Sequence, residues 1–195
     1  PRMAEPETAR RIYHQYIDVD KDENGTPTAI RFHDVEHFNF GFDVVDAIAA
    51  REPDRLAMLH LDREKRERRF SFADMRDLSN RCANYFRALG VRRGDRVMLV
   101  LKRHWQFWPS ILGLHKLGAI AIPATCQLQE HDFEYRYNAA GVKAILCTAD
   151  GDTAHQAEMA ARNAPTLETR ILVGGSREGW HDFDAELSAY SAEYP

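Results

Sequence analysis

The sequence has few cysteines, no glycine-rich phosphate-binding motif and no long apolar run. Its three cysteines, Cys82, Cys126 and Cys147, stand far apart and form no CxxC pair. This spacing argues against a disulfide framework or a cysteine-based zinc site, and it favours a reducing compartment. The apolar run at residues 117–124 is far too short to cross a bilayer, so no membrane span is expected.

Signals for export and for nucleic-acid binding are also missing. The N-terminal residues PRMAEPETARR carry charges but no apolar segment, so no signal peptide is expected. Together with the cysteine pattern, this predicts a cytoplasmic location, unless a targeting segment lies outside this sequence. The net charge of −4 does not indicate a nucleic-acid partner. The stretch REKRERR at residues 63–69 predicts a solvated hairpin or loop rather than a phosphate-binding patch, because its arginines alternate with glutamates.

The usual motifs of nucleotide and metal sites do not occur. Neither GxGxxG nor GxxxxGK[ST] is found among the 11 glycines, and Gly174-Gly175 is expected to form a surface turn. His33 and His37 have the spacing of two zinc ligands on a helix. The HExxH order and a third ligand are missing, so no metal site is expected. These residues predict a binding scaffold without a catalytic apparatus.

What is present is the composition of a globular protein. Hydrophobic residues make up 44% and charged residues 29% of the chain, which argues against disorder. Residues 1–40 are polar, with a turn signal at residues 22–25, and we expect an N-terminal extension there. Residues 41–195 are expected to form one α/β subdomain.

Strand and helix patterns alternate along this subdomain. The clearest element begins with a capping box at Ser71-Phe72-Ala73-Asp74 and continues with apolar residues at three- and four-residue steps to Leu89. The expected strands are 56–61, 97–101, 119–122, 144–147 and 170–173, and the expected helices are 44–49, 71–89, 105–117, 132–140 and 153–163. This alternation predicts an α/β fold with a largely parallel sheet flanked by helices.

Polar residues follow one of these strands directly. Gly118 is expected to end a helix in the left-handed conformation, and the apolar run after it to form a central strand. Pro123 should end strand pairing, because it has no N–H to donate. Since ligands bind at the carboxyl edge of parallel sheets, Thr125, Cys126 and Gln127 are placed like residues of a ligand cleft.

Two residues near this edge allow more than one interpretation. Cys126 could be a nucleophile, but no activating histidine can be assigned, and a small, partly buried thiol is the alternative. Arg136, next to Tyr135, could bind an anion or pair with a local carboxylate near its helix end. We include Arg136 with Thr125 and Cys126 as the possible edge of the cleft.

Two segments match known sequence motifs. FSFADM at residues 70–75 is similar to (L/F)(S/T)(F/Y)xEL, with Asp for Glu and Met for Leu, and HKLGAIAIP at residues 115–123 is similar to xKxGAxxxP. With these motifs the chain resembles the adenylate-forming enzymes, the superfamily of acyl-CoA synthetases, luciferases and peptide-synthetase adenylation domains. Finer features resemble the medium-chain acyl-CoA synthetase branch. These are FNF at 38–40 followed by DVVD at 43–46, Thr-x-Gln at 125–127, Tyr135-Arg136 and GWxxF at 179–183.

This resemblance, which covers about residues 38–190, implies a two-step reaction in the complete enzyme. A carboxylate attacks ATP to give an acyl-adenylate and pyrophosphate, and the thiol of CoA then displaces AMP. The implied cofactors are ATP, Mg2+ and CoA, and the implied substrate is a medium-chain carboxylic acid. The alternatives are another adenylate-forming ligase, for an aryl or short-chain acid, and a non-catalytic stand-alone binding module.

The family's Ser/Thr/Gly-rich phosphate loop with its lysine does not occur in this chain, nor do the later ATP motifs. The resemblance therefore implies the N-terminal subdomain of a larger enzyme, with the remainder of its own chain as partner. This part is expected to be inactive, to bind no cofactor by itself and to contain no catalytic residue. The oligomeric state is not predicted.

Gln127 is the one binding residue that the resemblance implies. It matches the glutamine that contacts CoA in the medium-chain branch. A side-chain amide suits this role, because pantetheine presents amides that need both donors and acceptors. The alternative is a local bond that stabilises the turn.

Overall fold

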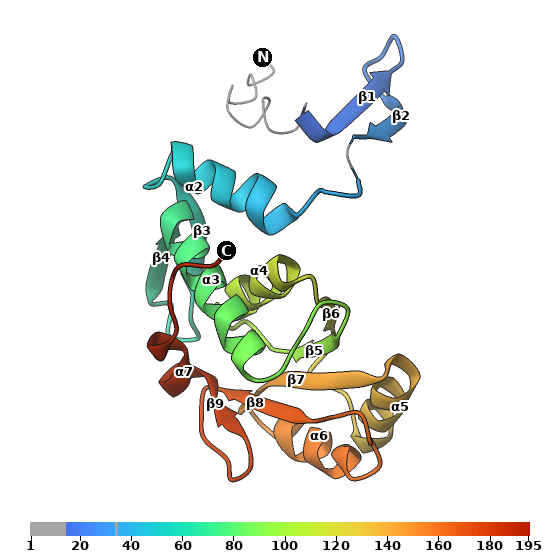
Figure 1. Cartoon of the computed structure of the whole chain (residues 1–195), viewed down its shortest axis with the longest axis vertical. Helices are drawn as coiled ribbons and strands as arrows, with labels where there is room; N and C mark the ends of the chain where they lie inside the picture. Colours follow the sequence, from blue (N-terminus) through green and yellow to red (C-terminus); the bar gives the residue numbers. More distant parts are fainter. Residues whose placement is uncertain (1–14, 34) are drawn as a thin grey trace. The chain divides into compact units, whose positions relative to one another are not determined.

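The computed structural model describes residues 15–33 and 35–195, and the chain divides into two compact units, residues 1–39 and 40–195 (Figure 1). Residues 1–14 of the expected N-terminal extension lie outside the described residues. The expected boundary between the N-terminal extension and the α/β subdomain, at residues 40 and 41, stays a prediction.

The first unit contains a β-hairpin that was not expected from the sequence. β1 (Ile17–Lys21) pairs antiparallel with β2 (Pro27–Phe32), on either side of the expected turn at residues 22–25. The signal was present in IDVDK, where apolar residues alternate with acidic ones at the period of two that is typical of a strand.

The second unit begins with a helical segment and another hairpin. The π-helical segment η1 (Phe40–Asp46) continues into α2 (Ala47–Arg51), so the helical region expected at residues 44–49 is longer than predicted. β3 (Leu56–Leu61) and β4 (Glu67–Ser71) form an antiparallel hairpin. The REKRERR stretch occupies its turn and part of β4, and its side chains are exposed, as expected.

The main element of this unit is a five-stranded parallel sheet in the order β6-β5-β7-β8-β9. Helices alternate with most of its strands along the chain. The bounds are α3 (Phe72–Ala88), β5 (Arg96–Val100), α4 (Phe107–Leu117), β6 (Ile120–Pro123), α5 (Glu130–Ala140), β7 (Val142–Thr148), α6 (Thr153–Ala161), β8 (Thr169–Val173), β9 (His181–Asp182), α7 (Phe183–Glu186) and the 3-10 helix η2 (Leu187–Ala189). The predicted α/β fold with a largely parallel sheet is confirmed.

Helices cover both faces of this sheet (Figure 1). Along β5, Val97 and Leu99 pack in an apolar cluster with α3, α4 and α7, whereas Met98 and Val100 pack in a second cluster with α5 and α6. Successive side chains of a strand point to opposite faces. A strand covered on both faces therefore needs a continuous apolar run, which is the pattern that made β5 and β7 recognisable.

Two predictions about helix ends are confirmed, and one about a strand is wrong. Ser71 forms a capping box with Asp74 at the start of α3. Gly118 ends α4 with φ of +72°, in the left-handed region where a Cβ is penalised. The run after Gly118, expected to be a central strand, is β6 at the edge of the sheet, and Ile120 is half-exposed. An apolar run indicates burial but does not show which strands lie beside it.

A buried ion pair joins three helical segments in this unit. Lys116 Nζ on α4 donates to Asp46 Oδ1 on η1 and to Asn80 Oδ1 on α3, both at 2.7 Å. The Lys116 side chain is fully buried, whereas that of Asp46 is 20% exposed. Burial lowers the pKa of Lys116 and raises the pKa of Asp46, although their mutual hydrogen bond acts in the opposite direction on each. The complete pair therefore adds little net stability, but neither ion can lose its partner without a large cost.

We expect Asp46→Asn to destabilise the chain by about 3–5 kcal/mol, because it leaves the buried Lys116 ammonium group without a counter-charge. Lys116→Met should cost less, since water can reach part of the Asp46 carboxylate. The loss in the double variant should be smaller than the sum of the single losses by about 0.5–3 kcal/mol. Urea unfolding of the three variants measures these differences.

Arg69→Met is the matched control, because it removes a cation from the exposed Arg69–Glu67 pair, whose charged atoms lie 3.3 Å apart. Exposed pairs contribute at most about 1 kcal/mol. Equal losses for Asp46→Asn and Arg69→Met, or additive losses in the double variant, would contradict the coupling assigned to the buried pair.

Candidate functional site

The strand order creates a crevice at one edge of the sheet. β6 lies on one side of β5, and β7 lies on the other. The connections therefore change direction between β5 and β7, and in open α/β sheets ligands bind outside the carboxyl ends of the strands at such a point. The segments that leave this edge are residues 101–106 after β5, 124–129 after β6 and 149–152 after β7.

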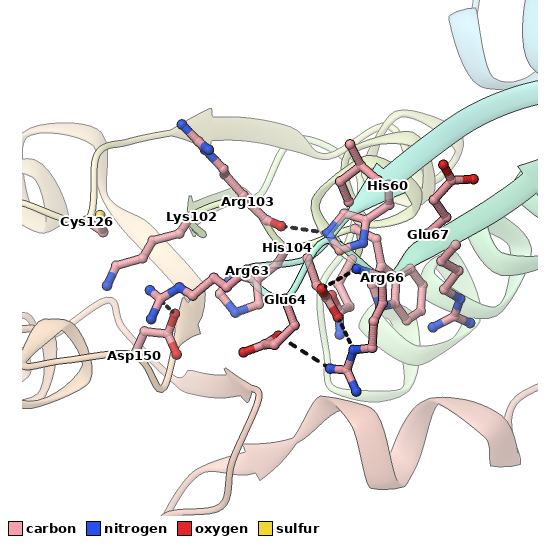
Figure 2. A pocket seen from close by; sticks show the side chains of 15 residues that line it. His60, Arg63, Glu64, Arg66, Glu67, Lys102, Arg103, His104, Cys126 and Asp150 are labelled. Carbon is pink, nitrogen blue, oxygen red and sulfur yellow. Dashed lines mark hydrogen bonds and ion pairs between the residues drawn. The ribbon is translucent and has the colours of Figure 1, made fainter.

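A cavity of about 850 Å³ lies between these segments and the β3–β4 hairpin (Figure 2). The hairpin contributes residues 60–64 and 66–68, the β5–α4 segment contributes residues 102–106, and Cys126 and Asp150 follow β6 and β7. His60 Nε2 lies 2.8 Å from the backbone oxygen of Arg103. Since a carbonyl only accepts, Nε2 carries the proton, and this bond joins the hairpin to the β5–α4 segment.

Charged side chains line this cavity, and several of its cationic side chains form ion pairs. Arg66 Nε lies 2.6 Å from the Asp62 carboxylate, and Arg63 Nη2 lies 3.2 Å from the Asp150 carboxylate. Lys102 differs, because it makes no hydrogen bond or ion pair within residues 15–33 and 35–195. The cavity therefore contains an ammonium group that is available to a ligand.

A second cavity of about 320 Å³ lies at the same edge. Lys102, Cys126 and Asp150 line both cavities, so the two meet at these side chains. The rest of the smaller cavity is formed by residues 127–129 after β6 and by residues 151–153 and Gln156 around the start of α6.

Gln127 lines the smaller cavity with a free side-chain amide. Its backbone N–H donates to Thr125 Oγ1 at 3.3 Å, and its backbone carbonyl accepts from Gln129 Nε2 at 3.5 Å. The side-chain amide itself makes no hydrogen bond with the residues that the structure describes. The turn therefore uses the backbone of Gln127, and the amide can bind a ligand.

The other predicted cleft residues differ in position. Cys126 is partly buried and lines both cavities, as noted above. Thr125 is exposed, lines neither cavity and accepts the backbone N–H of Gln127. Arg136 on α5 also lines neither. Its guanidinium donates to the backbone oxygen of Asp132 at 3.0 Å and lies 3.7 Å from the carboxylate of that residue. The structure thus brings together Cys126 and Gln127, but not Thr125 or Arg136.

His104 connects the ends of two strands beside the larger cavity. Burial lowers the pKa of its imidazole, so the ring is neutral at pH 7. Its Nε2 lies 3.4 Å from Thr148 Oγ1 at the end of β7. Its Nδ1 is buried and has no hydrogen-bond partner among the described residues. His104 therefore helps to hold the carboxyl ends of β5 and β7 together.

Lys102, His104 and Asp150 line the larger cavity but were not predicted from the sequence. They follow β5 and β7 closely, as residues 125–127 follow β6, so the rule applied to β6 would have found them. The hairpin residues carry no comparable signal, because they reach this edge only through the tertiary fold.

No metal site is recognisable in residues 15–33 and 35–195, where no group of three or more His, Cys, Asp or Glu could hold an ion. His33, considered above as a zinc ligand, follows β2, and its Nε2 lies 2.8 Å from the Asp18 carboxylate. In the same described ranges, no helix combines the length and the apolar character that a membrane crossing needs.

The match to a known family identifies the type of protein. A family model described as "AMP-binding enzyme" matches residues 45–193. The chain belongs to the AMP-binding enzyme family. It is 34% identical over 166 residues to the mitochondrial acyl-coenzyme A synthetase ACSM5 of Rattus norvegicus, a match that covers 82% of this chain and 28% of that protein.

Further relatives are similar over the same part. The mitochondrial acyl-coenzyme A synthetase ACSM1 of Homo sapiens is 34% identical over 179 residues, covering 88% of this chain and 31% of that protein. A solved structure, the fatty acyl CoA synthetase of Mycobacterium tuberculosis, matches with a TM-score of 0.68 and 25% identity, covering 80% of this chain and 29% of that one. The chain of this family member thus spans under a third of the length of these relatives, and the motif-based resemblance is confirmed.

The predicted cytoplasmic location is wrong in the light of the relatives ACSM5 and ACSM1, whose names describe mitochondrial enzymes. The prediction depended on three unpaired cysteines and on an N-terminal stretch without an apolar segment. Such cysteines indicate a reducing compartment, and the cytosol is not the only compartment of that kind.

We expect one thiol of this chain to react readily with 5,5′-dithiobis(2-nitrobenzoate) at pH 8. Burial raises the pKa of Cys82 and of Cys147 to about 12, so almost no thiolate forms at either. Cys126 is only partly buried, in a turn at the cavity edge. Absorbance should count one rapidly reacting thiol in the folded chain and three in urea.

Cys126→Ser is the control for this measurement. It should abolish the rapid reaction and leave the unfolding midpoint close to that of the parent. Two rapidly reacting thiols in the folded parent would contradict the burial of Cys82 or Cys147.

Proposed function

We propose that the complete protein is an ATP-dependent acyl-CoA synthetase for medium-chain carboxylic acids. The acid is activated as an acyl-adenylate with release of pyrophosphate, and the CoA thiol then displaces AMP. Activation is needed because a carboxylate is a poor electrophile, whereas AMP converts its oxygen into part of a leaving group. The match of residues 45–193 to the AMP-binding enzymes carries this proposal, and relatives named as acyl-coenzyme A synthetases support it.

The described residues fit CoA better than ATP or Mg2+. The free amide of Gln127 lines a cavity and suits the amides of pantetheine. The 195 residues contain no glycine-rich loop with a lysine for a triphosphate. Mg2+ prefers carboxylate oxygens and waters, and the described ranges contain no acidic cluster of that kind. We infer that this chain supplies part of the CoA site and that the remainder of the enzyme holds ATP, Mg2+ and the acid.

The same proposal covers the organisation of the chain. Residues 41–195 are the N-terminal subdomain of the larger enzyme, and residues 1–40 are an extension that precedes it. The match of the family model to residues 45–193 supports this division.

We expect these 195 residues alone to release no pyrophosphate in response to a carboxylic acid, because no lysine-bearing loop is present to stabilise the transferring group. The protein encoded by the complete reading frame should form AMP, fastest with medium-chain acids. The assay compares acids from acetate to palmitate, with benzoate as the aryl acid. Pyrophosphate release by the 195 residues, or a preference for acetate or benzoate, would contradict the corresponding part of the proposal. No AMP formation with any acid would favour a binding module.

In the complete protein, we expect Gln127→Ala to weaken CoA binding by about 0.5–1.5 kcal/mol, the contribution of one hydrogen bond. This corresponds to roughly a two- to twelve-fold rise in the apparent dissociation constant for CoA. Carboxylate-dependent pyrophosphate exchange should hardly change, because CoA enters only after adenylation. Both assays are made on the same folded variant.

Thr125→Val is the matched control. It removes the 3.3 Å hydrogen bond from the backbone N–H of Gln127 to Thr125 Oγ1, and it leaves the side-chain amide of Gln127 unchanged. This variant should have an apparent dissociation constant for CoA close to that of the parent. Two results would indicate that Gln127 only stabilises the turn. One is an equal loss of both half-reactions in Gln127→Ala, and the other is an equal weakening of CoA binding in Thr125→Val.

A further inference from the structure

An unpaired cation lies where the two cavities meet. Lys102 closely follows β5, is exposed and lines both cavities. Its ammonium group has no hydrogen bond or ion pair in the part of the chain that the structure describes. A Cβ built on Gly151 would lie 3.8 Å from Lys102 Nζ. The ammonium group therefore reaches across the crevice to the segment between β7 and α6.

A second cation reaches this place from the β3–β4 hairpin. Arg63 Nη2 lies 3.2 Å from Asp150 Oδ2, with side chains 77% and 40% exposed, respectively. Figure 2 shows Lys102 and Arg63 extending toward Asp150 from different elements, whereas the guanidinium of Arg103 points away. An ion pair this exposed is weak, so a ligand anion can compete with Asp150 for Arg63. Lys102 and Arg63 thus face Asp150 from two sides, whereas the Asp152 carboxylate in the smaller cavity accepts from Gln156 Nε2 at 2.6 Å.

We propose that Lys102 and Arg63 bind a phosphate group of the ligand whose amide part contacts Gln127. A ligand that passes from the smaller cavity into the larger one must pass Lys102, because the cavities meet there. Lysine acts as a point charge, and the planar guanidinium of Arg63 can bind two phosphate oxygens. Gly151 has no side chain, so space beside the ammonium group stays open.

This assignment rests on the proposed function, because CoA carries both amides and phosphates. ATP, the other phosphate-bearing substrate of that reaction, is an alternative source of the phosphate. Two probes distinguish these sources when they are titrated calorimetrically into the 195-residue chain at low salt. Adenosine 3′,5′-bisphosphate represents the nucleotide end of CoA, and metal-free ATP represents the triphosphate. Tighter binding of the first probe supports the assignment to CoA. Tighter binding of the second would overturn it, because ATP carries no amide group for Gln127.

Two substitutions should change the affinity of the chain for adenosine 3′,5′-bisphosphate in opposite directions. Lys102→Gln should weaken binding about three- to tenfold, because one charged contact to phosphate is lost. Asp150→Asn should tighten binding, because it removes the carboxylate that competes for Arg63. Lys102→Arg should keep most of the affinity. Added salt should reduce all of these differences, since the groups are exposed.

Lys65→Gln is the matched control, with the same loss of charge in the turn of the hairpin but outside the cavity lining. Equal weakening by Lys65→Gln and Lys102→Gln, or no tightening by Asp150→Asn, would overturn the assignment. A partly unfolded variant cannot bind more tightly, so the Asp150→Asn result tests the site independently of folding. If the Lys102 effect is absent while Gln127→Ala still weakens CoA binding, only the phosphate site fails and the proposed function stands.

Discussion

The second unit depends on the fully buried ammonium group of Lys116. Among the described residues, Asp46 and Asn80 are its hydrogen-bonding acceptors. Apolar faces alone allow many packings of three helical segments. A buried cation restricts them to arrangements that bring its acceptors within hydrogen-bond distance, because an unpaired buried charge is too costly. The pair therefore fixes α4 against η1 and α3. Gly118 follows two residues later and directs the chain into β6, so the position of the residues after β6 depends on this buried contact.

The features that the sequence predicted well are those determined by neighbouring residues. The capping box at Ser71 and the left-handed end at Gly118 each need only a few residues of chain. The strands β5 and β7 were recognisable because both of their faces are covered. The order of the strands is different, since it depends on how distant segments pair. This is why β6 was expected in the centre of the sheet and is found at its edge.

The same distinction explains which site residues were predicted. Cys126 and Gln127 follow a strand directly, and the rule for parallel sheets places such residues at the ligand edge. Arg136 has a carboxylate four residues earlier on its own helix, and a partner at this spacing is in reach whatever the rest of the fold does. Arg63 reaches the edge only because the β3–β4 hairpin lies against the segment after β5, where His60 bonds to Arg103. No local pattern contains that contact.

The buried pair and the cavity edge therefore tolerate change differently. A substitution at Lys116 or Asp46 disturbs three helical segments at once, whereas Gln127, Lys102 and Arg63 are exposed and lie on separate connecting segments. Changes on such segments alter ligand contacts while leaving the strands and helices in place. A TM-score of 0.68 at only 25% identity to the Mycobacterium tuberculosis enzyme agrees with this division. In open α/β folds ligands bind at the carboxyl edge of the sheet, and the side chains on the connecting segments differ from one protein to another, so a shared fold is compatible with the recognition of different ligand groups.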